Sequence, residues 1–190
     1  SMASGKSIES QIFETEPYVE AVQAIKRDDA PALRQLIRQG LDVNHESKEV
    51  RTAWGRDTAH LLLYATATDS VKAAEALLEA GADVNKSTRG GMAAIIMGAP
   101  SPSDELFELL LVRYKADPNK VLRIGVSKNA LMFVLQERRA LGEKRFDRAA
   151  TLVRYGADVN LELDGGSTAA ITFSKLGDWR AVYWLLENGA

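Results

Sequence analysis

The chain contains two histidines and no cysteine, so the side chains that most often bind metals or act as nucleophiles are scarce. His45 and His60 are 15 positions apart. A zinc site built on them would need further ligands from distant parts of the chain. We therefore expect no metal site. We interpret His60 as a helix residue that makes a packing or hydrogen-bond contact, and His45 as a solvated loop residue.

The segment SGKS, residues 4–7, is similar to the end of a phosphate-binding loop. Such a loop needs an upstream glycine at a fixed distance and a buried strand before it. The few residues that precede Gly5 supply neither. We predict that residues 1–13 form a flexible N-terminal tail.

Neighbouring carboxylates occur at Asp28 and Asp29 and again at Asp104 and Glu105. Such pairs act as acid and base only when a pocket removes them from water. Both pairs lie where helices are expected to begin, and negative charge there complements the helix dipole. No serine lies in the glycine pattern of a nucleophile elbow. We expect no catalytic residue, no cofactor and no enzyme activity.

The composition is that of an ordinary globular protein, with 46% apolar and 26% charged residues and a net charge of -2. This balance does not favour nucleic-acid binding by the whole molecule. No run of apolar residues is long enough to predict a membrane span. We expect a cytoplasmic location. A periplasmic or secreted one stays open, because the initial SM is typical of a cloning remnant that replaces a native start.

One phrase recurs along the chain and indicates a repeat protein. LIRQGLDVN ends at Asn44, LLEAGADVN at Asn85, LVRYKADPN at Asn119 and LVRYGADVN at Asn160, and LLENGA ends at Ala190. The glycine position of the phrase holds Gly40, Gly81, Lys115, Gly156 and Gly189, at spacings of 41, 34, 41 and 33 residues. We expect a single domain over residues 14–190. Its units end near residues 44, 85, 119, 160 and 190, and the last is cut short.

Each phrase predicts the end of a helix. Two apolar residues pack the last turn, and a glycine in the left-handed region stops it. Asp and Asn then suit a tight turn, because their side chains bond nearby backbone. A further helical stretch precedes each phrase, for example at residues 18–25, 58–65, 130–136 and 168–174. At Lys115 the pattern predicts a strained left-handed residue that is not glycine.

The GADVN segments and the stretch STAAITFSKLGDWRAVYWLLENGA resemble the ankyrin repeat, and the resemblance covers nearly the whole chain. It implies an all-α solenoid of about five helix-turn-helix units that binds proteins through loop fingers and a concave surface. The family's Thr-Pro-Leu-His opening is replaced here by DTAHLL, GMAAII, KNALMF and STAAIT. We therefore expect cohesion to depend more on apolar stacking than on hydroxyl–imidazole bonds.

Two units are longer than the family's repeat of about 33 residues. The excess lies in residues 45–57 and in residues 120–128 together with QERRALGEKR. Long insertions often mark a binding face, and tolerated drift is the alternative. Trp and Arg are enriched at interface hot spots. Across the expected fingers 45–57, 86–91, 120–128 and 161–167, the candidate partner-binding residues are Arg51, Trp54, Arg56, Arg89, Arg123 and Lys128.

Trp54 has two interpretations: it folds back over the flank of the stack, or it contacts a partner. We favour the second, because residues 45–57 exceed what the repeat needs. Near the other end, Trp179, Tyr183 and Trp184 either pack on the preceding unit or meet a continuation of the chain or a partner.

Residues 120–154 hold nine basic and three acidic side chains, a local net charge of +6. A solvated helix face or a surface for an acidic partner would explain this excess. Nucleic acid is disfavoured, because base-stacking aromatics are not interleaved in the stretch.

We expect a monomeric, non-enzymatic protein-binding module, of the kind that includes inhibitors and immunity-type antagonists. Two alternatives stay open. One is a scaffold or targeting domain of a larger enzyme or effector, and the other is a binder of an anionic ligand through the basic fourth unit.

Overall fold

The computed structural model describes residues 16–190, which are mostly helical, with eleven α-helices and a few short strands. The all-α expectation is confirmed at this level. Contacts divide the chain into two compact units, with the boundary between Ala94 and Ile95. The expected tail at 1–13, with its SGKS segment, lies outside the described residues.

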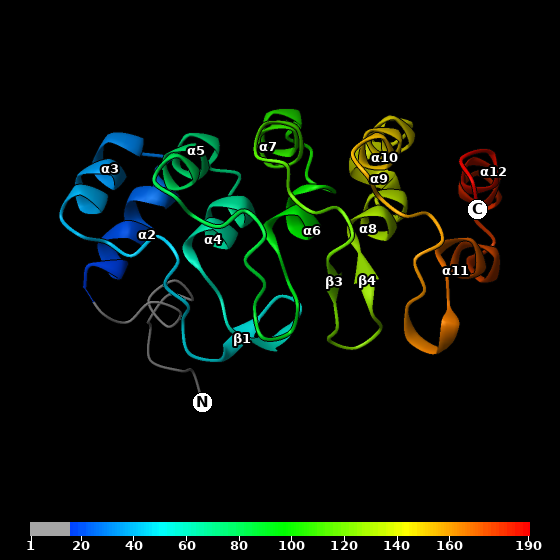
Figure 1. The fold of residues 1–190 in the computed structure, drawn as a ribbon, viewed down its shortest axis with the longest axis horizontal. Helices are drawn as coiled ribbons and strands as arrows, with labels where there is room; N and C mark the ends of the chain where they lie inside the picture. Colours follow the sequence, from blue (N-terminus) through cyan, green and yellow to red (C-terminus); the bar gives the residue numbers. More distant parts are fainter. Residues whose placement is uncertain (1–15) are drawn as a thin grey trace. The chain divides into compact units, whose positions relative to one another are not determined.

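The first unit contains two helix pairs that pack on each other. Its helices are α2 (Tyr18–Lys26), α3 (Ala30–Arg38), α4 (Leu61–Ala67) and α5 (Val71–Glu79). Helix α2 packs on α3 and α4 packs on α5, while α2 contacts α4 and α3 contacts α5 (Figure 1). The leucines Leu33, Leu61 and Leu77 are fully buried in this unit. Burial of each such side chain contributes about 1.5–3 kcal/mol.

Hydrogen bonds between the turns set the register of the two pairs. Asp29 caps α3 by accepting a bond from the Ala32 N–H at 3.0 Å. Ser70 donates to the Ile25 carbonyl at 2.6 Å, and Asp28 accepts from the Ala73 N–H at 2.9 Å. The second helix pair is therefore tied to the first through its turn.

A β-hairpin, rather than an irregular loop, joins the two helix pairs. Strand β1 (Val50–Thr52) runs antiparallel to β2 (Gly55–Asp57). Figure 1 shows it beyond α4, on the side away from α5. Helix α4 begins three residues later than the predicted start at 58, because the chain is still extended at His60, the capping residue.

The second unit continues the alternation of helices and short ribbons. Helix α6 (Ala94–Gly98) spans the boundary. The remaining elements are α7 (Asp104–Glu108), the π-helical segment η1 (Leu109–Arg113), β3 (Val121–Leu122), β4 (Lys128–Asn129), α8 (Ala130–Gln136), α9 (Arg138–Leu141), α10 (Lys144–Arg154), the 3-10 turn η2 (Asp164–Gly166), α11 (Ala169–Leu176) and α12 (Trp179–Glu187). Helix α8 packs on α10 and α11 packs on α12.

Both stretches of excess length in the second unit are structured. The loop expected at 120–128 contains the antiparallel ribbon β3–β4. The segment QERRALGEKR contains the short helix α9, where only a turn was expected. The expectation of purely helical units joined by loops therefore needs correction at both hairpins.

The recurring Asp and Asn form the same contacts in both units. In each of four phrases the Asp side chain accepts a bond from the N–H of the Asn two residues later. Asn119 also donates to the Gly156 carbonyl at 2.9 Å and accepts from the Asp158 N–H at 2.8 Å. Asn44 makes the equivalent bonds in the first unit. The tight turn is confirmed. Its Asn also bonds to the backbone of the next phrase, a contact that we call the Asn clasp.

The predicted left-handed backbone at the phrase ends is confirmed. Gly40, Gly81, Gly156 and Gly189 have φ values between +98° and +109°. Lys115 has φ of +55°, so a lysine does stand in a conformation that favours glycine.

Candidate functional site

Four of the six candidate residues gather on the first unit, around the β1–β2 hairpin. Arg51 and Arg56 are directly opposite each other across the ribbon. Side chains at opposite positions share one face of an antiparallel pair, so two like charges are neighbours here. Trp54 lies in the hairpin turn, and Arg89 comes from the loop before α6.

Trp54 is anchored to its own hairpin. Its ring is half-buried, and its indole N–H donates to the Asp57 carboxylate at 2.8 Å. This contact supports the interpretation in which the side chain folds back. The donor is already used, so only the exposed part of the ring remains for a partner.

Asp57 is a fully buried carboxylate that joins the hairpin to the next loop. Besides Trp54, it accepts hydrogen bonds from the N–H groups of Thr58 and Gly90, both at 2.8 Å, and from the Thr88 hydroxyl. A carboxylate buried without a cation is stabilised only when such donors satisfy it. The hairpin and residues 88–90 therefore form one rigid piece.

Arg89 is held beside the hairpin by the same network. Its backbone N–H donates to the Thr58 hydroxyl at 3.0 Å. Its guanidinium reaches Glu49 at 3.4 Å, and the Nε of Arg56 reaches the other oxygen of Glu49 at 3.2 Å. A single carboxylate is thus shared by two arginines that come from different segments.

His60 bridges two segments of the first unit. Its Nδ1 accepts from the Leu63 N–H at 3.3 Å, and its Nε2 lies 3.0 Å from the Lys86 carbonyl. Burial lowers the pKa of the imidazole to about 4. The predicted hydrogen-bond contact is confirmed. The ring bonds to backbone groups and not to a hydroxyl, and it ties the α4 cap to the loop that follows α5.

His45 is not simply solvated, as was expected. It is half-buried, and its ring stacks on Tyr18 with centroids 3.9 Å apart and an interplanar angle of 16°. The residue covers the first helix pair instead of pointing into solvent.

The other two candidates, Arg123 and Lys128, belong to the second unit. Arg123 is exposed in the loop between β3 and β4. Hydrogen bonds from Ser127 lower the pKa of Asp164, and the charge of Arg123 lowers it further. The Lys128 ammonium lies 3.4 Å from the Gln136 side-chain oxygen and 5.3 Å from the centre of the Phe133 ring. Lys128 is therefore occupied within its own unit.

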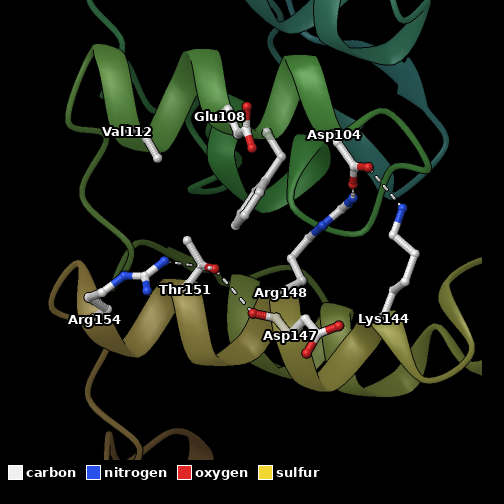
Figure 2. Close-up of a pocket in the computed structure, with 9 residues that line it drawn as sticks. Asp104, Glu108, Val112, Lys144, Asp147, Arg148, Thr151 and Arg154 are labelled. Atoms are coloured by element: carbon white, nitrogen blue, oxygen red, sulfur yellow. Dashed lines mark hydrogen bonds and ion pairs between the residues drawn. The ribbon is translucent and has the colours of Figure 1, made fainter.

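The basic stretch 120–154 does not form one solvated face. Arg148 is buried: it donates to the carbonyls of Ala99 and Ser101 and to Asp104, and it lies over the Phe107 ring. Figure 2 shows α7 and η1 facing α10, with Arg148 and Lys144 both directed at Asp104. The cleft between these helices has a volume of about 170 Å³, and the Lys144 ammonium lies 2.9 Å from the Asp104 carboxylate. These two cations lower the Asp104 pKa.

Arg145 is the second buried arginine of α10, and it bonds to a residue of α8 and to the start of α12 rather than to α7. It donates to the Leu135 carbonyl and forms an ion pair with Asp178, the cap of α12. The hydrogen bond from Arg145 lowers the Asp178 pKa. The local net charge of +6 overstates the charge offered to a partner, because part of it stabilises helix packing.

The structural interpretation of the carboxylate pairs is confirmed. Asp29 caps α3, and Asp104 lies in the first turn of α7 and binds the two cations described above. Within residues 16–190 no group of three or more His, Asp and Glu side chains is arranged to hold a metal ion. In the same residues no helix has the length and hydropathy to cross a membrane.

The aromatic residues of α12 divide between two environments. Trp184 is half-buried, with its ring centroid 6.4 Å from that of Phe146 on α10. Trp179 and Tyr183 are 56% and 64% exposed. Packing on the preceding helices therefore holds for Trp184 and is wrong for the other two.

Sequence reasoning missed the residues that position the finger, namely Glu49, Asp57, Thr58 and Thr88. Local signals for the hairpin itself were present. Val50 and Thr52 are β-branched, and Gly55, with φ of +126°, follows the turn as the first residue of β2. No sequence signal connects Asp57 to Gly90, because that contact spans 33 residues.

No model of a protein family matches the chain. A search of curated proteins also finds no match.

Proposed function

We propose that this protein is a non-enzymatic binding module of the ankyrin-repeat type that grips an acidic protein partner through its fingers. The observation that carries the proposal is the anchored hairpin of the first unit. It presents Arg51, Arg56 and Arg89 beside a half-buried Trp54 on a backbone fixed by buried hydrogen bonds. A preorganised surface loses little conformational entropy on binding.

The ankyrin-type assignment is supported by the clasp between successive phrases. Asn44 bonds to the phrase at Gly81, Asn119 to that at Gly156, and Asn160 to that at Gly189. The same contact thus recurs at three of the phrases, as expected for a stack of similar repeats. We propose that this pattern runs through a solenoid of about five helix-turn-helix repeats.

An antagonist or immunity-type role fits a module of this kind, which acts by occupying the partner's surface and needs no reacting group. The alternative of a scaffold within a larger enzyme or effector predicts the same finger contacts. An anionic-ligand site on the basic stretch 120–154, the fourth repeat, has less support, because Arg145, Arg148 and Lys144 already form ion pairs.

Affinity capture from the native source followed by mass spectrometry tests the proposal. We expect one stoichiometric protein partner. We expect the double variant Arg51→Gln/Arg56→Gln to release it, while Arg139→Gln, an exposed arginine of α9, retains it. Recovery of the protein alone, or equal binding by the double variant, would contradict the finger-based function.

A further inference from the structure

Two of the three arginines around the β1–β2 hairpin, Arg56 and Arg89, bind a carboxylate of the same chain. Glu49 contributes one oxygen to Arg56 and the other to Arg89, at 3.2 and 3.4 Å. We propose that Glu49 is a displaceable occupant of a carboxylate-binding site, and that the group it stands in for is the Asp or Glu side chain of an acidic protein segment. This inference rests on the proposed function and names the chemistry of that site.

The internal contact is weak enough to be exchanged. The side chains of Arg56, Arg89 and Glu49 are 68%, 75% and 40% exposed. Exposed ion pairs contribute about 0–1 kcal/mol, because water screens them and two long side chains must be held in place. A partner's carboxylate can therefore replace Glu49 with little loss.

The site keeps a net positive charge even with Glu49 in place. Glu49 pairs with Arg56 and Arg89, while Arg51, directly opposite Arg56 on the ribbon, has no ion pair with any other described residue. Two like charges directly opposite each other on a ribbon are destabilising unless an anion lies between them. An incoming carboxylate relieves this repulsion between Arg51 and Arg56, so the site favours a segment with more than one acidic side chain.

Buried hydrogen bonds of the backbone hold the arginines of the site in position. Asp57 holds Gly90, and Thr58 holds the Arg89 N–H, so the arginine from the second loop stays beside the hairpin when Glu49 leaves. Planar guanidinium groups bind carboxylates through two parallel hydrogen bonds, and Glu49 uses only the Nε of Arg56. The terminal nitrogens of Arg56 therefore remain for the bidentate contact that a partner's carboxylate would make.

Titration with a short poly-glutamate peptide at low salt tests the inference, with the Arg56 Nε–H resonance as the site-specific readout. We expect Glu49→Gln to tighten binding about two- to fivefold, which corresponds to removal of a competitor worth about 0.4–1 kcal/mol. We expect Arg51→Gln/Arg56→Gln to weaken it at least about tenfold. Poly-glutamine of the same length should not shift the resonance.

Glu20→Gln is the matched control, because it makes the same change in net charge at an exposed position of α2. Equal tightening by Glu20→Gln would overturn the inference, since bulk charge would then explain the effect. Binding of single-stranded DNA at least as tight as that of the peptide would also overturn it. If Glu49→Gln has no effect while the captured partner still needs Arg51 and Arg56, the proposed function stands and this inference fails.

Discussion

Asp57 accepts four hydrogen bonds in a buried position, and each comes from a group that builds the finger. At the scale of single residues, this carboxylate and the buried His60 are the side chains on which the candidate site depends. Both connect the segment before α4 to the following loop, by bonds that water cannot replace inside the unit.

We expect Asp57→Asn to destabilise the first unit by about 2–3 kcal/mol, because an amide cannot accept all four bonds and turns a donor toward another donor. Urea denaturation followed by circular dichroism would measure this loss. Trp54→Phe removes one of the four bonds, together with part of a half-buried ring, so a smaller loss of about 1 kcal/mol is expected. An unchanged midpoint for Asp57→Asn would refute the anchoring role.

His60 makes stability depend on pH. Burial lowers its folded pKa from 6.5 to about 4, so below pH 6.5 the unfolded chain takes up a proton that the folded chain does not. Stability is present above pH 6.5 and is lost as the pH falls toward 4. From pH 7 to pH 5 we expect a loss of about 2 kcal/mol from this group.

The matched variant is His60→Asn, because Asn129 caps α8 in the same manner, accepting from the Met132 N–H at 3.0 Å. Urea midpoints of both proteins across this pH range give the comparison. The variant should lose most of the slope between pH 6.5 and 5. A parallel slope in both proteins would show that other groups cause the acid sensitivity.

At the scale of elements, each of the four complete phrases combines a left-handed residue with an Asp turn, and three of them add an Asn that bonds to the next phrase. Lys115 departs from this pattern by placing a lysine at φ of +55°, and its ammonium lies 4.9 Å from the centre of the Tyr155 ring. Backbone strain and a cation–π contact therefore oppose each other at this position.

We expect Lys115→Gly to raise stability by about 0.5 kcal/mol, since relief of about 1–2 kcal/mol of strain is partly offset by the lost contact and by the greater freedom of glycine when unfolded. The gain should increase in a Tyr155→Leu background, where the ring contact is already absent. Melting temperatures of the four proteins decide this, and a lower value for Lys115→Gly in both backgrounds would disprove the strain.

Asn119 tests the clasp itself. We expect Asn119→Ala to cost about 1–2 kcal/mol, because the bonds to the Gly156 carbonyl and the Asp158 N–H are both lost. Asn119→Asp keeps an acceptor but removes the donor, so its urea midpoint should fall between those of the other two proteins. A midpoint for Asn119→Ala equal to that of the parent would rule out a stabilising clasp.

At the scale of the whole molecule, some charged side chains are buried and stabilise helix packing, and others are exposed to solvent. Arg148 is buried among carbonyl oxygens, whereas Arg139 is exposed on the same charged stretch. We expect Arg148→Met to destabilise by about 3 kcal/mol, because it leaves the Ala99 and Ser101 carbonyls without their donor. Arg139→Gln should stay within about 0.5 kcal/mol. Equal urea midpoints for the two variants would refute this division.

The sequence by itself determined the features that depend on neighbouring residues. It predicted α2 and α8 nearly to the residue, the left-handed phrase ends and the Asp turns, because helix propensity, glycine stops and side-chain-to-backbone bonds act over a few positions. Only the tertiary structure decided which charged side chains face solvent. Arg148 meets Ala99 across 49 residues and Asp57 meets Gly90 across 33, and no local pattern encodes a partner that far away. The hydrogen bond of Trp54 to Asp57 spans only three residues, yet it forms because those distant contacts hold Asp57 in its buried place.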